Sequence, residues 1–158
     1  MSNWIDDLKE QDVQHQEHLS SMNAIRLHNA NVVRAKAPAL WSLLIIQIEA
    51  YLEQLRASFP HDMTRQADLI KRGDSYTLQG KKLPLSVMKL TLNLDGSCIN
   101  ISQGIKHEFA DRPTLTPSKP IDFKVTNDED VVFFWKDWNY ADPSLIAEQL
   151  VKIACRLH

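Results

Sequence analysis

Glycine is absent from the first 72 residues of this 158-residue chain. The four glycines then fall within 32 positions, and none follows. They are Gly73, Gly80, Gly96 and Gly104. Because glycine marks turns and the ends of helices, this distribution predicts a helical N-terminal part, a turn-rich middle and a short C-terminal run. It bears on architecture and excludes no function.

Cysteine and long apolar runs are also scarce. Cys98 and Cys155 are the only cysteines, a number typical of reduced thiols in a cytoplasmic protein. The longest apolar run, Leu43 to Ile46 with its neighbours, is too short to span a bilayer. The first residues lack the basic and then apolar pattern of a secretory signal. We therefore expect a cytoplasmic protein that does not contact a membrane.

Recognisable catalytic and metal-binding motifs are missing. No serine lies in a nucleophile elbow, and no glycine-rich phosphate loop is present. His15 and His18 would share a helical face, but a metal site needs further ligands that the sequence does not offer nearby. Two exposed histidines are the simpler interpretation. We expect no catalytic residue, no cofactor and no bound metal, and we favour a protein that is not an enzyme.

Charge is nearly balanced overall, at −2, but is uneven along the chain. Residues 1–20 carry a net charge of −4, and residues 60–90 carry a net charge of +3. These segments could attract each other within one chain or between chains, although two solvated faces are the simpler interpretation. Nucleic-acid binding, which we do not expect, would require the basic residues of the second segment to gather on one face. Those residues include Lys71, Arg72, Lys81, Lys82 and Lys89.

Three helices are predicted in the first 60 residues. Asn3 can cap the first, and Ser20 or its neighbour can cap the second. Pro38 should break or kink the chain and begin a third helix, which Pro60 ends. Residues 39–57 are apolar almost all round at their start. A helix of this kind normally lies at the centre of a core.

The clearest local signal is a hairpin at Asp95-Gly96, a dipeptide typical of two-residue β-turns. The turn places Leu92 opposite Ile99 and extends the same register along both strands. Side-chain alternation agrees with this register, with one apolar face and one polar face. The sequence therefore predicts a sheet with one buried face and one wet face.

More strands are expected on both sides of this hairpin. Residues 121–125 and 131–135 predict a second hairpin, and residues 106–120, which contain three prolines, predict a long loop. Residues 62–72 fit either a short helix or a strand that turns at Gly73. A C-terminal helix should begin at Pro143, after Asp142.

These elements predict an α+β fold with N-terminal helices, an antiparallel meander of about five strands and a C-terminal helix packed on the sheet. We expect a single domain over residues 1–158. Its helical part covers residues 1–60, its antiparallel sheet residues 61–141 and its C-terminal helix residues 142–158.

An aromatic segment at residues 133–140 is the first candidate site. If the segment is extended throughout, Trp138 and Tyr140 lie on one face and Trp135 on the other. These side chains could be core, or they could bind a ligand or a partner. His107 and Glu108, at the start of the predicted loop, could belong to the same site, with the loop as a lid.

The second candidate surface is residues 1–37, where the apolar positions are sparse. Helices of this kind often gain stability by pairing, within one chain or across a two-fold axis. We therefore expect a non-enzymatic, intracellular protein-binding or interaction module, for which a homodimer is one form. The alternative is a small-molecule-binding protein or enzyme with its pocket between the sheet and loop 106–120.

Overall fold

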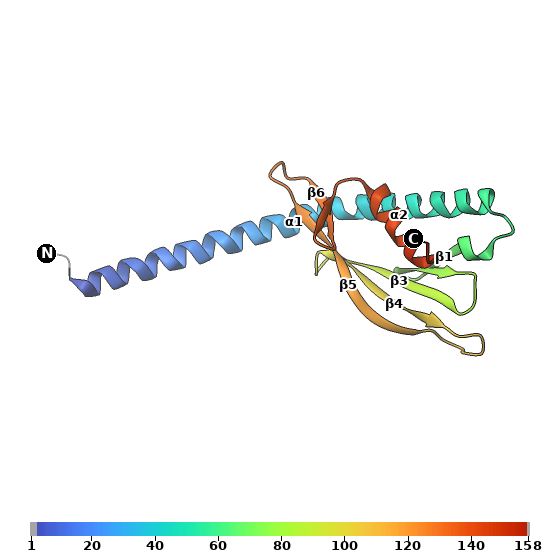
Figure 1. Ribbon diagram of the computed structural model, residues 1–158. Coiled ribbons are helices and arrows are strands. Elements are labelled where there is room, and N and C mark those ends of the chain that lie inside the picture. Colours follow the sequence, from blue (N-terminus) through green and yellow to red (C-terminus); the bar gives the residue numbers. More distant parts are fainter. Residues whose placement is uncertain (1–2, 158) are drawn as a thin grey trace.

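The computed structural model describes residues 3–157 and confirms the α+β class (Figure 1). One long helix comes first, followed by a continuous antiparallel sheet and a second helix. The elements in order are α1 (Trp4–Ser58), the short 3-10 helix η1 (Met63–Arg65), β1 (Ala67–Arg72), β2 (Ser75–Gly80), β3 (Leu85–Asn93), β4 (Cys98–Lys106), β5 (Thr114–Val125), β6 (Val131–Trp135), β7 (Trp138–Tyr140) and α2 (Pro143–Ala154).

The sheet is a meander of seven strands in sequence order, which is two more than expected. One additional strand is β1, so the ambiguous segment 62–72 ends as a strand after the short helix η1. It turns through Gly73, whose φ of 60° is easily adopted by glycine. The other is β7, which pairs with β6 at the edge of the sheet.

The predicted hairpin between β3 and β4 is confirmed in its register. Leu92 pairs with Ile99, and Leu90 pairs with Ile101. All four side chains lie on the face that meets the helices, where Leu90 and Ile99 are completely buried. On the opposite face, the hydroxyls of Ser75 and Thr91 are within hydrogen-bonding distance of each other.

Both helices lie on the same side of the sheet, and the core fills the space between the helices and the sheet (Figure 1). The Asp142 carboxylate accepts a hydrogen bond from the Ser144 amide at 2.9 Å and caps α2 as expected. From there Ile146 and Leu150, both fully buried, pack against α1 and the sheet. The largest fully buried side chains are Trp135, Phe133, Leu44, Ile48, Leu78, Met88, Leu90, Ile99, Ile101, Ile121, Ile146 and Leu150.

The N-terminal region differs from the prediction of three helices, because α1 is a single helix of 55 residues. Asn3 caps it and Phe59 ends it before Pro60, as expected, but Ser20 and Pro38 lie inside it. A proline within a helix removes one hydrogen bond, at a cost of about 3 kcal/mol. Val33 and Ala37 before it and Leu44 after it are all buried. Their packing offsets the cost, and the helix bends where it reaches the body instead of breaking (Figure 1).

The expected loop 106–120 is also shorter than the sequence indicates, because β5 already begins at Thr114. Two of its three prolines, Pro117 and Pro120, lie within β5 and do not interrupt the sheet. In this stretch β5 pairs with β4, whereas its pairing with β6 begins only at Asp122. The proline nitrogens therefore lie in an edge stretch, where a missing N–H donor is tolerated.

Candidate functional site

The aromatic segment is divided by a tight turn that the sequence analysis missed. Lys136 and Asp137 adopt φ values of 50° and 67° and reverse the chain between β6 and β7. Trp135 therefore pairs with Trp138, on the same face, and the alternation expected for an extended segment is wrong. Such a turn normally contains glycine or asparagine, and neither marks these two positions.

The three aromatic candidates have different environments. Trp135 is 2% exposed, and its indole N–H donates to the carbonyl oxygen of Lys119 at 3.3 Å. Tyr140 is half-buried at the margin of the core. Trp138 is 70% exposed at the sheet edge. Of these three, only Trp138 offers most of its surface to a partner.

His107 and Glu108 are exposed in the connection between β4 and β5. This connection ends at Thr114, the first residue of β5. Lys119, the residue of β5 that contacts Trp135, lies five residues further along the strand. That length of strand spans roughly 16 Å, at about 3.3 Å per residue. The structure therefore does not bring His107 and Glu108 together with the aromatic segment.

The two charged segments are also far apart within one chain. Residues 60–90 belong to the body, whereas the start of α1 lies at the free end of the arm-like first half of this helix (Figure 1). Their basic side chains do not share a face, because the strand register puts Lys71 on the helix side of the sheet and Lys89 on the other side. Several also have acidic neighbours, such as Lys81 at 3.6 Å from Asp68.

The feature that stands out is the first half of α1. Every residue from Trp4 to His28 is exposed, and the first partly buried one is Asn29. We call residues 4–28 the arm. Figure 1 shows the arm projecting from the body, with no other element beside its N-terminal part. At about 1.5 Å per residue, it extends for roughly 37 Å.

The arm carries eight large apolar side chains that are all at least 43% exposed. They are Trp4, Ile5, Leu8, Val13, Leu19, Met22, Ile25 and Leu27. Six positions separated by alternating steps of three and four residues form one face of the arm. We call this face the stripe, and it consists of Ile5, Leu8, Asp12, His15, Leu19 and Met22. The stripe continues the helix face that is buried from Val33 onward.

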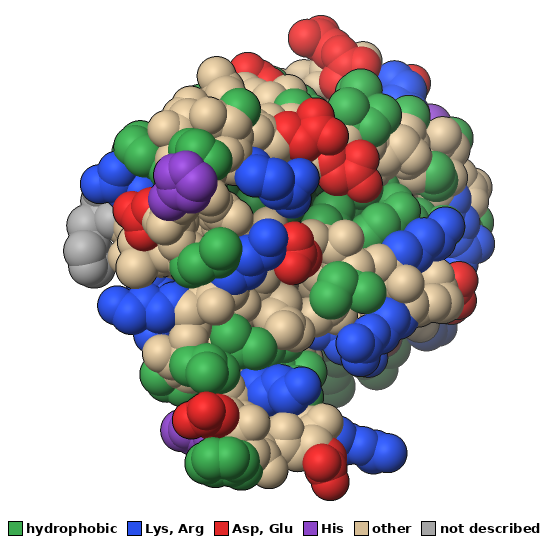
Figure 2. Space-filling model, turned by 90° about the vertical axis from the view of Figure 1, so that its right-hand side faces the viewer, with side chains coloured by type: hydrophobic (Ala, Val, Ile, Leu, Met, Phe, Trp, Pro, Cys, Tyr) green, Lys and Arg blue, Asp and Glu red, His purple; other side chains and the backbone are tan. Residues whose placement is uncertain are grey.

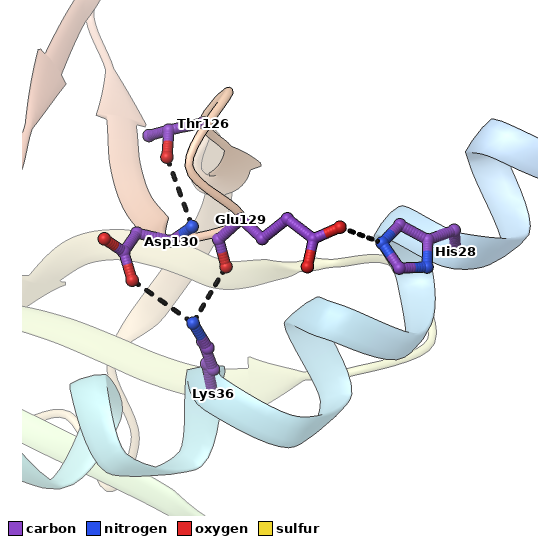
Figure 3. A network of polar contacts seen from close by, with 5 residues as sticks. All are labelled: His28, Lys36, Thr126, Glu129 and Asp130. Atoms are coloured by element: carbon purple, nitrogen blue, oxygen red, sulfur yellow. Dashed lines mark hydrogen bonds and ion pairs between the residues drawn. The ribbon is translucent and has the colours of Figure 1, made fainter.

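Ion pairs hold α1 to two turns of the sheet where the arm leaves the body (Figure 3). His28 Nε2 lies 2.7 Å from Glu129 Oε1. The Lys36 ammonium group donates to the Glu129 carbonyl oxygen at 2.8 Å and to the Asp130 carboxylate at 3.2 Å. Both acidic residues belong to the β5–β6 turn.

The β3–β4 turn makes a similar contact, with Arg34 Nη2 at 3.2 Å from the Asp95 carboxylate. A hollow of about 740 Å³ opens beside it, between α1, this turn and β5. Apolar side chains from both sides line it, including Met22, Ile25, Val33 and Phe123. Because Met22 belongs to the stripe, the hollow continues the apolar surface of the arm onto the body.

The opposite end of the body has a different surface. Figure 2 shows Lys and Arg side chains interspersed with acidic and apolar ones over that face. Such mixing is typical of an ordinary solvated surface. The contrast directs attention to the arm and the adjoining hollow.

The titratable side chains give little indication of catalysis. Burial raises the pKa of the Cys155 thiol to about 11 and also raises that of Cys98, so neither is an activated nucleophile. Within residues 3–157, no three potential metal ligands are grouped, and His15 and His18 stand exposed on the arm. In the same part of the chain, neither helix has the combination of length and apolar content needed to cross a bilayer.

No known protein family matches this chain, and neither the characterised proteins nor the solved structures include a significantly similar one. The candidate site therefore depends on its own geometry. The sequence analysis indicated the arm through the sparse apolar positions of residues 1–37, of which Met1 and Ser2 lie outside the described residues. It missed the hollow, whose walls come from segments about a hundred residues apart in sequence.

Proposed function

We propose that this protein is a non-enzymatic interaction module that binds a helical protein segment along the stripe of its arm. The observation that carries the proposal is that every residue from Trp4 to His28 is exposed, with eight large apolar side chains among them. Scattered apolar residues on a surface need no explanation, but apolar side chains aligned along one face of an exposed helix, as in the stripe, are typical of a protein-binding surface.

The stability of the arm supports the same proposal. Its sequence contains three Asp, three His and one Asn residue, which are only moderate or poor helix formers. Most helices in proteins owe their stability to the packing of an apolar face, and within residues 3–157 the arm buries none of its residues in such packing. A bound helix would supply it.

An enzyme or small-molecule site between the sheet and the β4–β5 connection has less support. His107 and Glu108 lie well away from the aromatic segment, and Trp135 is a core residue. A cytoplasmic location remains part of the proposal. It is supported by two cysteines that are both unpaired and buried.

Photo-crosslinking in the native cells tests the proposal. A photoreactive amino acid at Leu19 should give a covalent adduct with a polypeptide, identified by mass spectrometry. The same amino acid at Val13, which is exposed on the other side of the arm, is the matched control and should give little adduct. If neither position yields a specific polypeptide adduct, the proposal is wrong.

A further inference from the structure

The stripe has an internal symmetry that the proposed function does not require. Read from its N-terminal end, it runs apolar, apolar, acidic, histidine, apolar, apolar. The steps between these positions are three, four, three, four and three residues, which are the same in both directions. Only the central pair, Asp12 and His15, changes when the stripe is read backwards.

This symmetry makes the stripe complementary to itself when two arms run in opposite directions. With the midpoint between Val13 and Gln14, each apolar position of one arm comes level with an apolar position of the other. The pairs are Ile5 with Met22 and Leu8 with Leu19, each occurring twice. Facing positions of this kind interlock in antiparallel helix pairs. The central layers then bring Asp12 of each arm opposite His15 of the other.

A parallel pairing of the same two arms lacks this complementarity. Asp12 would face Asp12, and His15 would face His15. Two carboxylates in one apolar seam repel each other and lose their hydration without gaining a partner. The charge pattern therefore favours the antiparallel orientation.

The body leaves room for the antiparallel pair. The paired positions end at Met22, whereas the burial of α1 against its own body begins at Asn29, just after the contact of His28 with Glu129. In this register Trp4 of the second copy comes level with Asn23, which follows Met22, a residue that lines the 740 Å³ hollow. The exposed Trp4, at 69%, therefore lies where the hollow offers apolar side chains such as Met22 and Ile25.

We infer that the partner of the arm is a second copy of this chain, bound antiparallel through residues 5–22 with Asp12 opposite His15. This inference rests on the proposed function, because it names the occupant of the same surface. The result is a two-fold symmetric dimer with the two bodies at opposite ends of the paired arms.

The mass in solution is the first test. Sedimentation velocity of the purified full chain, over a concentration series, should show conversion from one 18.1 kDa chain to two. Leu19→Glu should raise the dissociation constant by about tenfold or more, because it puts a charge into two apolar layers. Val13→Glu, away from the stripe, is the matched control and should leave the constant nearly unchanged. Both positions are exposed, and circular dichroism should show that the fold is retained in both variants.

Charge exchange tests the orientation. Asp12→Lys places a lysine opposite His15 and should weaken the dimer by several-fold. Adding His15→Glu pairs that lysine with a glutamate of the other copy and should restore wild-type association or exceed it. In a parallel dimer, the double variant would instead oppose like charges and dissociate. Failure of the double variant to restore the dimer overturns the antiparallel register.

The outcomes separate this inference from the proposed function. A wild-type chain that stays monomeric over the whole series, or a Leu19→Glu variant that dimerises as well as Val13→Glu, overturns the inference. The proposed function would still stand if the crosslinking at Leu19 identified a different polypeptide. It would fall together with the inference only if no polypeptide were captured.

Discussion

The two halves of α1 belong to one uninterrupted helix but have opposite surroundings. In the docked half, residues 29–58, six side chains are buried against the sheet and α2. In the arm, no side chain between Trp4 and His28 is buried, even in part. A single continuous helix thus carries two apolar faces in line, one buried in its own core and one exposed along the arm.

The sequences of the two halves explain why only one of them docks. In the docked half the inward positions are apolar at nearly every turn, as at Val33, Leu44 and Ile48. In the arm the same helix face is interrupted by Asp12 and His15. A charged carboxylate is costly to bury without a partner group. A surface that supplies such a group in register can accept the arm, and the protein's own sheet does not extend that far (Figure 1).

The body should be far less tolerant of small changes than the arm, and Gly104 gives the largest effect. A Cβ atom at this position would lie 1.7 Å from the Thr114 carbonyl oxygen across the β4–β5 pair. Gly104→Ala should therefore force the strands apart and cost about 4 kcal/mol or more in the free energy of unfolding, measured with urea. Gly73→Asn is a control, because an added Cβ atom at position 73 meets no atom within 4 Å apart from those of its immediate neighbours in the chain, and the positive φ there is one that asparagine tolerates. Equal stability of the two variants would contradict the strand contact.

The next comparison sets one large-to-small substitution in each half of the helix. Ile48→Ala, at a fully buried site, should lower the free energy of unfolding by about 3 kcal/mol. Leu19→Ala, at a site that is 45% exposed, should leave the unfolding of the body within about 0.5 kcal/mol of wild type. Urea titrations at the lowest practical protein concentration measure both values without a contribution from association. A large loss at Leu19 under these conditions would mean that the arm packs on its own body.

Helix caps provide a finer comparison. Asp142→Ala removes the cap of α2, which packs in the core, and should lower the melting temperature by about 2–5 °C. Asn3→Ala removes the cap of the arm, where Asn3 accepts from the Ile5 amide at 3.3 Å. It should leave the melting temperature unchanged and raise only the amide exchange rates of the first turns. An equal fall in melting temperature for both variants would contradict the expectation that the arm contributes less than α2 to the stability of the fold.

The pH dependence of the Asp142 cap has a definite sign. The hydrogen bond from the Ser144 amide lowers the pKa of the Asp142 carboxyl below its ordinary value. A lowered folded-state pKa stabilises the protein above the unfolded-state value of about 3.9, and the contribution disappears as the pH falls through the folded-state pKa. The difference between wild type and Asp142→Ala should therefore be full at neutral pH and shrink in acid. A difference that grows below pH 4 would contradict this origin.

The smallest expected effect concerns the contacts between α1 and the β5–β6 turn. Lys36→Ala removes contacts with Glu129 and Asp130, both on the exposed β5–β6 turn. The loss should be only about 0.5 kcal/mol, because water and salt screen exposed pairs. It should vanish at high salt when unfolding is followed at several ionic strengths. Ala35→Gly, next to it on α1, is a control whose cost should not depend on salt.

The sequence predicted those parts of the fold that local chemistry determines. The Asp95-Gly96 turn fixed the register of β3 and β4, and Asp142 with Pro143 marked the start of α2. The ends of α1, at Asn3 and before Pro60, were correct for the same reason. Capping groups and turn residues act within a few positions, so their effect can be seen without a tertiary structure.

The errors have a tertiary origin. Pro38 was expected to begin a new helix, but packing on both of its sides keeps one helix continuous. Pro117 was assigned to a loop, although it lies in a strand stretch that has a partner on only one side. The turn at Lys136 and Asp137 has no glycine or asparagine to signal it. In each case the surroundings in the folded chain outweigh the residue's own preference.

The candidate surface was predictable only in part. Sparse apolar positions predicted an interaction surface within residues 1–37. Which of these residues pack on the sheet depends on where the strands lie, and the sequence does not give that position. The stripe could be seen only after the structure showed one unbroken helix through Ser20, because a helix start there would have changed its alignment.

The contacts of Glu129, Asp130 and Asp95 with α1 have a consequence for how such a molecule could diversify. The core holds the docked half of α1, and two short turns add contacts where the arm leaves the body; Figure 3 shows those of the β5–β6 turn. Turns accept changes in sequence and length more readily than the strands they join. A few substitutions there could aim the same arm along a new path, and in a pair of copies each such change would alter the angle between the two bodies.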